Sequence, residues 1–183
     1  MITLGTLSGV PASTRTDLLA APTLAALDGL GLLDEVAVVE IDPGISDTAA
    51  TRDAFALEPN WLANCVVVGG RRDGLEKIAA CVVLASTRAD VNTAVRKLLD
   101  VRKASFLPME QAVDLTGMEY GGITPVGLPA AWPIFVDSRV IAEPAVIIGS
   151  GVRRSKILLP GRLLERLPGV QVVEGLATGI SPA

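Results

Sequence analysis

Glycine and proline divide this chain into many short apolar runs along its whole length. The 183 residues include 18 glycines and 12 prolines, which are dispersed and form no low-complexity tract. Since both residue types mark turns and element boundaries, the pattern predicts many short helices and strands. Half of the residues are hydrophobic, which is enough for one sizeable core but little for two. We therefore expect one domain that spans residues 1–183.

Hydrophobic periodicity and capping residues predict helices and strands in mixed order. Helices are expected over residues 18–27 (capped by Asp17), 48–57, 91–99 (capped by Asp90), 108–113 and 162–167. Strands are expected over residues 36–41, 64–68, 77–84, 103–106, 133–137, 145–148 and 156–159. Strand pairs with scattered helices predict an α+β domain with a mixed, largely antiparallel and partly barrel-like sheet.

The strands at 64–68 and 77–84 are expected to form a hairpin, because only a short polar turn separates them. Counting outward from Asp73 places Cys65 opposite Cys81 in this hairpin. Both cysteines lie in Val-rich strands, where a free thiol usually packs as a small hydrophobic group. We expect two reduced thiols of low reactivity.

The longest apolar stretch, residues 18–33, is interpreted as a buried helix. Pro22 and Asp28 interrupt it, and no basic cluster precedes it as a secretory segment would require. The sequence therefore predicts a cytoplasmic protein without a membrane partner.

Composition excludes several kinds of site. The chain contains no histidine, which excludes Ser/His/Asp and Cys/His triads, and two cysteines are the only soft metal ligands. We expect neither a metal nor a cofactor. The net charge of −4 argues against DNA binding through whole-surface attraction to phosphate. Three local basic groups are each interpreted as a solvated face: Arg71 and Arg72; Arg96, Lys97, Arg102 and Lys103; and Arg153, Arg154 and Lys156.

The segment most suggestive of chemistry is the run Gly121, Gly122, Ile123, Thr124 and Pro125. Two residues without a Cβ let the backbone approach a ligand closely, and the proline stiffens the return of the loop. Such a loop can offer amide N–H groups to a carbonyl or phosphate oxygen. A glycine and proline cluster is more often a plain turn, so the surrounding motifs decide its interpretation.

Those motifs are Thr116-Gly117, Gly121-Gly-Ile-Thr-Pro125, Pro133-Ile-Phe-Val-Asp137 and Ile148-Gly-Ser-Gly-Val-Arg153. In order and spacing they resemble the YbaK/ProX family, the free-standing relatives of the prolyl-tRNA synthetase editing domain, which deacylate mischarged aminoacyl-tRNA. The resemblance covers about residues 36–168, and residues 1–35 are expected to form a helical extension.

The resemblance implies that the loop at 121–125 wraps the aminoacyl group and the terminal adenosine. Gly149, Ser150 and Gly151 would form the opposite wall, with Cys65, Asp137 and Arg153 as further substrate-binding candidates. For Asp137 a cap carboxylate and a pocket group are equally open interpretations, and Thr116 is interpreted as a helix-end hydrogen-bonding group.

One position departs from the family pattern. Asn64 stands where most catalytic members of the family have a lysine that is thought to hold the ribose and phosphate of the terminal nucleotide. Asparagine can hydrogen-bond a hydroxyl but carries no charge. Lys77, on the partner strand, is a candidate substitute for that lysine.

The resemblance implies a trans-acting aminoacyl-tRNA deacylase whose partner is the acceptor end of a misacylated tRNA, and it extends to association with an aminoacyl-tRNA synthetase. Loop amides would stabilise the oxyanion and position water, so no side-chain nucleophile is needed. Two alternatives remain open: a non-catalytic aminoacyl-tRNA-binding paralogue, and a small-molecule binder or hydrolase unrelated to tRNA. Cys65 as a nucleophile is a less favoured variant.

Overall fold

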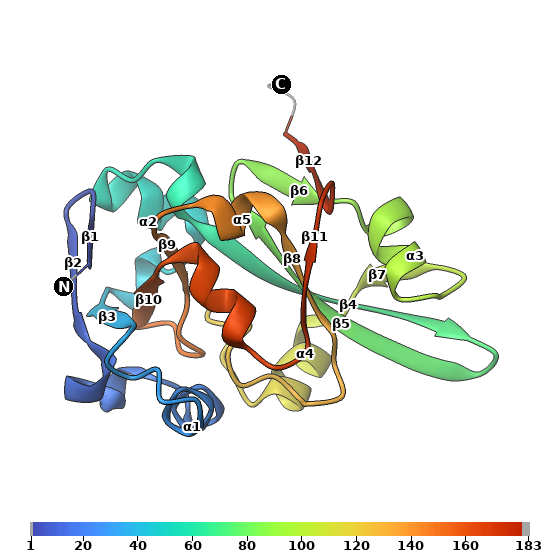
Figure 1. Ribbon diagram of the computed structural model, residues 1–183, viewed down its shortest axis with the longest axis horizontal. Helices are drawn as coiled ribbons and strands as arrows, with labels where there is room; N and C mark the ends of the chain where they lie inside the picture. Colours follow the sequence, from blue (N-terminus) through green and yellow to red (C-terminus); the bar gives the residue numbers. More distant parts are fainter. Residues whose placement is uncertain (1, 181–183) are drawn as a thin grey trace.

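Two five-stranded sheets form the framework of the protein in a computed structural model that describes residues 2–180 (Figure 1). The strands are β1 (Ile2–Leu4), β2 (Leu7–Pro11), β3 (Ala37–Glu40), β4 (Ala63–Arg72), β5 (Leu75–Leu84), β6 (Thr87–Ala89), β7 (Ala104–Phe106), β8 (Ile134–Asp137), β9 (Val146–Gly149), β10 (Ser155–Leu159), β11 (Val170–Val173) and β12 (Ala177–Gly179). The helices are α1 (Ala21–Gly29), α2 (Thr48–Phe55), α3 (Arg96–Leu98), α4 (Met109–Thr116) and α5 (Ser138–Ala142). Short 3-10 helices cover Ala12–Thr14, Thr16–Leu18, Pro43–Ile45, Pro59–Trp61 and Gly161–Arg166, and a π-helical turn covers Val91–Val95.

The sheets have the strand orders β1-β2-β3-β10-β9 and β11-β8-β5-β4-β7. Only the pairings of β8 with β5 and with β11 are parallel; the other described pairings are antiparallel. A bridge between Leu62 and Ile147 joins the edge of one sheet to the other. The result is an antiparallel half-barrel with helices around it, which confirms the predicted α+β class.

The main core lies between the two sheets. Val82 and Val136 from one sheet and Val38 and Ile157 from the other are fully buried in one hydrophobic cluster. A second cluster, which includes Cys81 and Phe135, covers the opposite face of β5 and β8. Burial of apolar side chains on both faces explains why β5 is a continuous run of small and β-branched residues over 79–83.

The β4–β5 hairpin corrects the predicted register by one residue. Its turn is Asp73-Gly74, with φ values of 52° and 80°, so both strands continue through the expected polar turn. Positive φ at both central residues is typical of the two-residue turn that matches strand twist. Cys65 therefore pairs with Val82, not with Cys81, and the two thiols belong to different clusters. Both cysteines are free.

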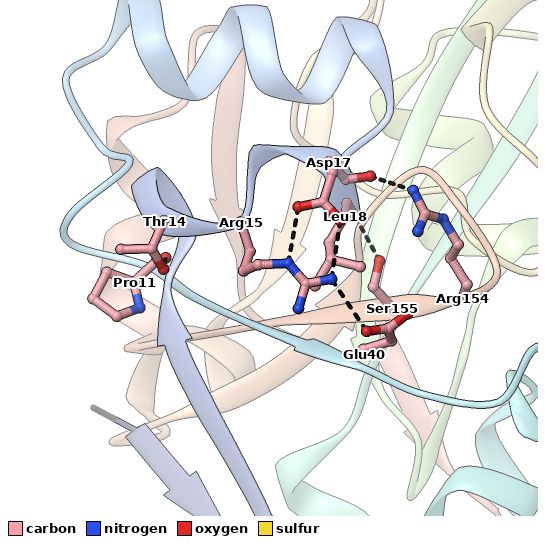
Figure 2. A network of polar contacts seen from close by, with 8 residues as sticks. All are labelled: Pro11, Thr14, Arg15, Asp17, Leu18, Glu40, Arg154 and Ser155. Carbon is pink, nitrogen blue, oxygen red and sulfur yellow. Dashed lines mark hydrogen bonds and ion pairs between the residues drawn. The ribbon is translucent and has the colours of Figure 1, made fainter.

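The N-terminal segment also differs from the predicted helical extension. Residues 2–11 form the β1–β2 hairpin, which pairs with β3. Asp17 lies in a 3-10 helix and does not cap α1, which begins at Ala21 with a proline in its first turn. Figure 2 shows how this segment is held: Arg15 contacts Asp17 and Glu40, and Ser155 of β10 donates to the carbonyl oxygen of Leu18 at 2.5 Å.

Other boundaries agree with the prediction to within a few residues. Asp90 caps the helical segment that follows it, accepting a hydrogen bond from the amide of Thr93 at 3.0 Å. The first turn of that segment is π-helical. The predicted helix at 108–113 continues to Thr116 and ends at Gly117, which has a left-handed φ of 65°.

Candidate functional site

A cavity of about 320 Å³ opens at the seam where β4 of one sheet meets β9 of the other. Its walls are the start of β4, the end of β9, the residues that begin α2 and the glycine loop after α4. The lining residues are Ser46, Asp47, Thr48, Leu62, Ala63, Asn64, Cys65, Val66, Tyr120, Gly121, Ile123, Ile147, Ile148, Gly149, Arg153 and Lys156. The lining is mostly apolar, and its polar and charged residues include Ser46, Asn64 and Lys156.

The cavity exists because the first half of β4 lacks a neighbouring strand on one side. β7 pairs with β4 only at Val68, Gly69 and Gly70, so residues 63–66 stay uncovered on that edge. Where β7 does pair, β4 has two glycines, because a Cβ on Gly69 would lie 2.6 Å from the Leu107 side chain and a Cβ on Gly70 would lie 2.3 Å from the carbonyl oxygen of Lys103. Edge backbone and alternating side chains at 63–66 are thus available to the cavity.

The glycine loop packs directly against the end of β9. A Cβ on Gly149 would lie 2.4 Å from the carbonyl oxygen of Gly122, and a Cβ on Gly122 would lie 2.7 Å from the backbone of Val152. The amide of Gly151 donates to the carbonyl oxygen of Gly122 at 2.7 Å. The structure therefore brings the two predicted glycine motifs together, and the glycines are required by backbone contact between the motifs.

Only part of the predicted loop faces the cavity. Gly121 and Ile123 line it, and within residues 2–180 their amide N–H groups make no hydrogen bond to the protein. The amide of Gly122 donates a hydrogen bond to the carbonyl oxygen of Glu119, at 2.9 Å. Thr124 is fully buried outside the cavity, and Pro125 lines a separate apolar cavity next to α1.

Two residues of the predicted opposite wall do not reach the cavity either. Ser150 is fully buried, and its hydroxyl lies 2.7 Å from that of Ser155. Gly151 has a left-handed φ of 85°, and a Cβ there would lie 2.4 Å from the side chain of Ala20. Of the three residues predicted for this wall, only Gly149 lines the cavity, while the other two fix the turn behind it.

Asn64 lies in the cavity wall, and the oxygen of its side-chain amide accepts a hydrogen bond from the protein. Thr48, the first residue of α2, donates its hydroxyl to Asn64 Oδ1 at 2.6 Å. This leaves the NH₂ group of Asn64 as a hydrogen-bond donor. Lys77 does not supply a positive charge to this cavity, because it lies in the outer half of β5 and donates to the carbonyl oxygen and carboxylate of Asp100.

Lys156 is the cation that sequence reasoning missed. It lies on β10, opposite Gly149, is only 7 % exposed and lines the cavity. Its Nζ donates to the carbonyl oxygen of Ser46 at 2.6 Å. Burial, reinforced by the nearby Arg153, lowers the pKa of Lys156 to about 8, and Asp47 opposes that shift. The sequence did carry a signal, since a lone lysine within an otherwise apolar strand is unusual for a solvated face.

Arg153 and Tyr120 stand at the mouth of the cavity. The Arg153 guanidinium donates to the carbonyl oxygens of Tyr120 and Pro43, at 3.2 and 3.0 Å, and so ties the glycine loop to the segment before α2. Tyr120 is the only tyrosine of the chain and is 58 % exposed. An exposed aromatic ring at a cavity mouth offers a flat surface on which a base can stack.

Cys65 lines the cavity floor, but burial raises the pKa of its thiol far above the usual range. Burial also raises the pKa of the Cys81 thiol, to about 12. Because the thiolate is the reactive form of cysteine, the surroundings of Cys65 disfavour nucleophilic attack by its sulfur.

Asp137 and Thr116 serve the fold. Asp137 caps α5 through the amide of Arg139, pairs with the guanidinium of Arg139 at 2.8 Å and accepts the amide of Ala177. It does not line the cavity, and its contacts are those of a capping carboxylate. Thr116 donates to the carbonyl oxygen of Ala112 at 2.7 Å, as a helix-end residue does.

The polar side of the cavity is rich in hydrogen-bond donors. Lys156, Arg153 and the NH₂ of Asn64 lie around it, and Asp47 is the one carboxylate among its lining residues. The buried hydroxyl of Ser46, in the cavity lining, has no hydrogen-bond partner among the described residues, and neither has that of Thr124, which lies outside the cavity. Residues 2–180 hold no cluster of three or more metal-ligating side chains, and no described helix is long and apolar enough to cross a membrane.

Comparisons with known proteins give one family and several solved structures. A model of the aminoacyl-tRNA editing domain matches residues 42–167. A putative trans-editing enzyme for prolyl-tRNA synthetase is similar over 94 % of this chain and 100 % of its own, with 23 % identity and a TM-score of 0.72. A hypothetical protein is similar over 86 % of this chain and 99 % of its own (19 % identity, TM-score 0.73). A scaffold from computational epitope grafting is similar over 88 % and 97 % (24 % identity, TM-score 0.71). No curated protein gives a significant match.

Proposed function

Because the chain belongs to the aminoacyl-tRNA editing domain family, we propose that it hydrolyses the ester of misacylated tRNA, acting in trans and in the cytoplasm. The observation that carries this proposal is the position of the cavity. All of its lining residues, from Ser46 to Lys156, fall within the region that the family model matches. An ester hydrolase needs a recess with oxygen-directed donors, and this cavity has them.

The proposed reaction is attack of water on the carbonyl carbon of the aminoacyl ester, with departure of the ribose oxygen. The amides of Gly121 and Ile123, which have no described protein partner, would donate to the developing oxyanion. The NH₂ group of Asn64 would hold a ribose hydroxyl. Since the chain contains no histidine, a substrate hydroxyl would relay the proton to the leaving oxygen.

The test is a deacylation screen of the purified protein against a panel of misacylated tRNAs, with correctly acylated tRNAs as controls. We expect at least one misacylated tRNA to lose its amino acid well above the spontaneous rate. Asn64→Ala should then lower the rate about tenfold, because it removes one neutral hydrogen bond. No acceleration on any member of the panel would contradict the proposal.

The absence of the family lysine at position 64 favours one second candidate, a binding module without hydrolysis. Such a protein would bind the acceptor end yet leave every ester intact, so binding without turnover in the same screen would select it. Association with an aminoacyl-tRNA synthetase belongs to either version, and co-purification with prolyl-tRNA synthetase would test it.

A further inference from the structure

We propose that Lys156 binds the phosphate of the terminal nucleotide and supplies from β10 the positive charge that Asn64 on β4 does not. This inference rests on the proposed function, because it names the residue that would hold the anionic part of that substrate. Both residues line the same cavity but come from different sheets.

Lys156 is buried without a counterion among the residues that the structure describes. Lys156 is 7 % exposed, and no carboxylate forms an ion pair with it among residues 2–180. Burying an ammonium group without a counterion opposes folding, so such groups are rare unless they are paired or bind a ligand. A single carbonyl oxygen, that of Ser46, occupies one of the three N–H donors.

The side-chain hydroxyl of Ser46 is a further buried polar group without a partner in the described part of the chain. Ser46 is 1 % exposed, lines the cavity, and its Oγ has no hydrogen-bond partner in the described structure. A buried hydroxyl without a partner opposes folding unless a ligand or a solvent molecule completes it. Ser46 thus provides a second donor next to the lysine that its own carbonyl oxygen positions.

The donors that line the cavity fit an anionic ligand. Two cations, Lys156 and Arg153, and two neutral donors, Ser46 and Asn64, face one recess. This donor set matches the several acceptor oxygens of a phosphate better than the single carbonyl oxygen of an ester. The other titratable groups that line the cavity are Asp47, Cys65 and Tyr120.

The experiment measures binding of two probes that cannot be hydrolysed. One is 3′-amino-3′-deoxyadenosine 5′-monophosphate with alanine attached through an amide bond, and the other is the same molecule without its 5′-phosphate. Alanine is used because its side chain is a single methyl group, which places little steric constraint on the pocket. We expect the wild type to bind the phosphorylated probe about ten- to a hundredfold more tightly, as for a hydrogen bond to a charged group. Lys156→Met should bind both probes equally.

Two further variants separate a phosphate contact from a purely structural role. Asn64→Lys placed in the Lys156→Met background should restore the phosphate preference, because it returns a cation to the same recess. The wild-type preference should also weaken as pH rises past about 8, where Lys156 loses its proton, and Lys156→Arg should keep it up to pH 9.5. Circular dichroism and thermal unfolding establish that each variant is folded.

The outcomes distinguish the two claims. If Lys156→Met keeps the phosphate preference of the wild type, or if the wild type shows none, this inference is overturned while the deacylase proposal stands on its own screen. If the wild type binds neither probe and deacylates nothing, both are overturned.

Discussion

At the scale of single residues, the decisive feature is a charged group in an apolar strand. Lys156 shares its strand with Ile157 and Leu158, both fully buried. Sequence reasoning grouped Lys156 with its basic neighbours as a solvated face, because the burial of a strand residue depends on which sheet covers it. Asn64 was recognised as unusual, but its hydroxyl partner Thr48 could not be foreseen, since it comes from another element.

The depressed pKa of Lys156 predicts a pH-dependent stability. Because the pKa falls from 10.5 unfolded to about 8 folded, the unfolded chain binds more protons between these values, and stability rises with pH across that window. The shift corresponds to about 3 kcal/mol. The free energy of unfolding in urea, measured for the wild type minus Lys156→Met at pH 7 and 10.5, should increase by up to this amount. If the free energies of unfolding of the wild type and Lys156→Met changed in parallel with pH, the pKa of Lys156 would not be lowered by folding and the prediction would be wrong.

At the scale of elements, the site depends on contact between the glycine loop and the end of β9. The sequence located both glycine motifs and predicted that they form opposite walls of one site, and in the structure the two motifs are in direct contact. The sequence could not distinguish glycines that face the cavity from those that pack behind it. That distinction depends on which backbone atoms of other segments lie where a Cβ would be, as the carbonyl oxygen of Gly122 does for Gly149.

Gly149→Ala is expected to displace the loop. Its Cβ would lie 2.4 and 2.7 Å from the carbonyl oxygens of Gly122 and Ile123, so the backbone must shift. Overpacking of this kind costs about 1–3 kcal/mol, and deacylation should fall at least tenfold because the loop amides move. The matched control is Gly29→Ala in α1, where no atom lies within 4 Å of the added Cβ. An active Gly149→Ala with unchanged thermal stability would contradict this description of the site.

At the scale of the whole molecule, the N-terminal segment is part of the fold. The main core cluster includes Leu18, Leu27 and Leu32. The amide of Ala20 donates to the backbone carbonyl oxygen of Ser150 at 3.1 Å, in the turn behind the site. The sequence predicted a helical extension because residues 1–35 carry no family motif. Their strands were missed since β1 and β2 are short, and pairing of β2 with β3 is a non-local contact.

Removal of residues 1–35 should therefore abolish cooperative folding. The deletion exposes the apolar surface of the main cluster and leaves β3 without its neighbour β2. We expect a shortened chain beginning at Val36 to aggregate or to show no cooperative thermal transition. A soluble, cooperatively unfolding product would show instead that the segment is an accessory to a self-sufficient domain.

If the cavity between β4 and β9 receives the aminoacyl end of tRNA, its backbone amides should respond to a substrate mimic. Nuclear magnetic resonance mapping of backbone amides during titration with a CCA trinucleotide carrying alanine through a 3′-amide bond measures this response directly. We expect the largest shifts on Asn64, Gly121, Gly149 and Lys156, with little change at Leu30 and Ala130 in the separate apolar cavity. Shifts confined to that second cavity, or no saturable shifts at all, would contradict it.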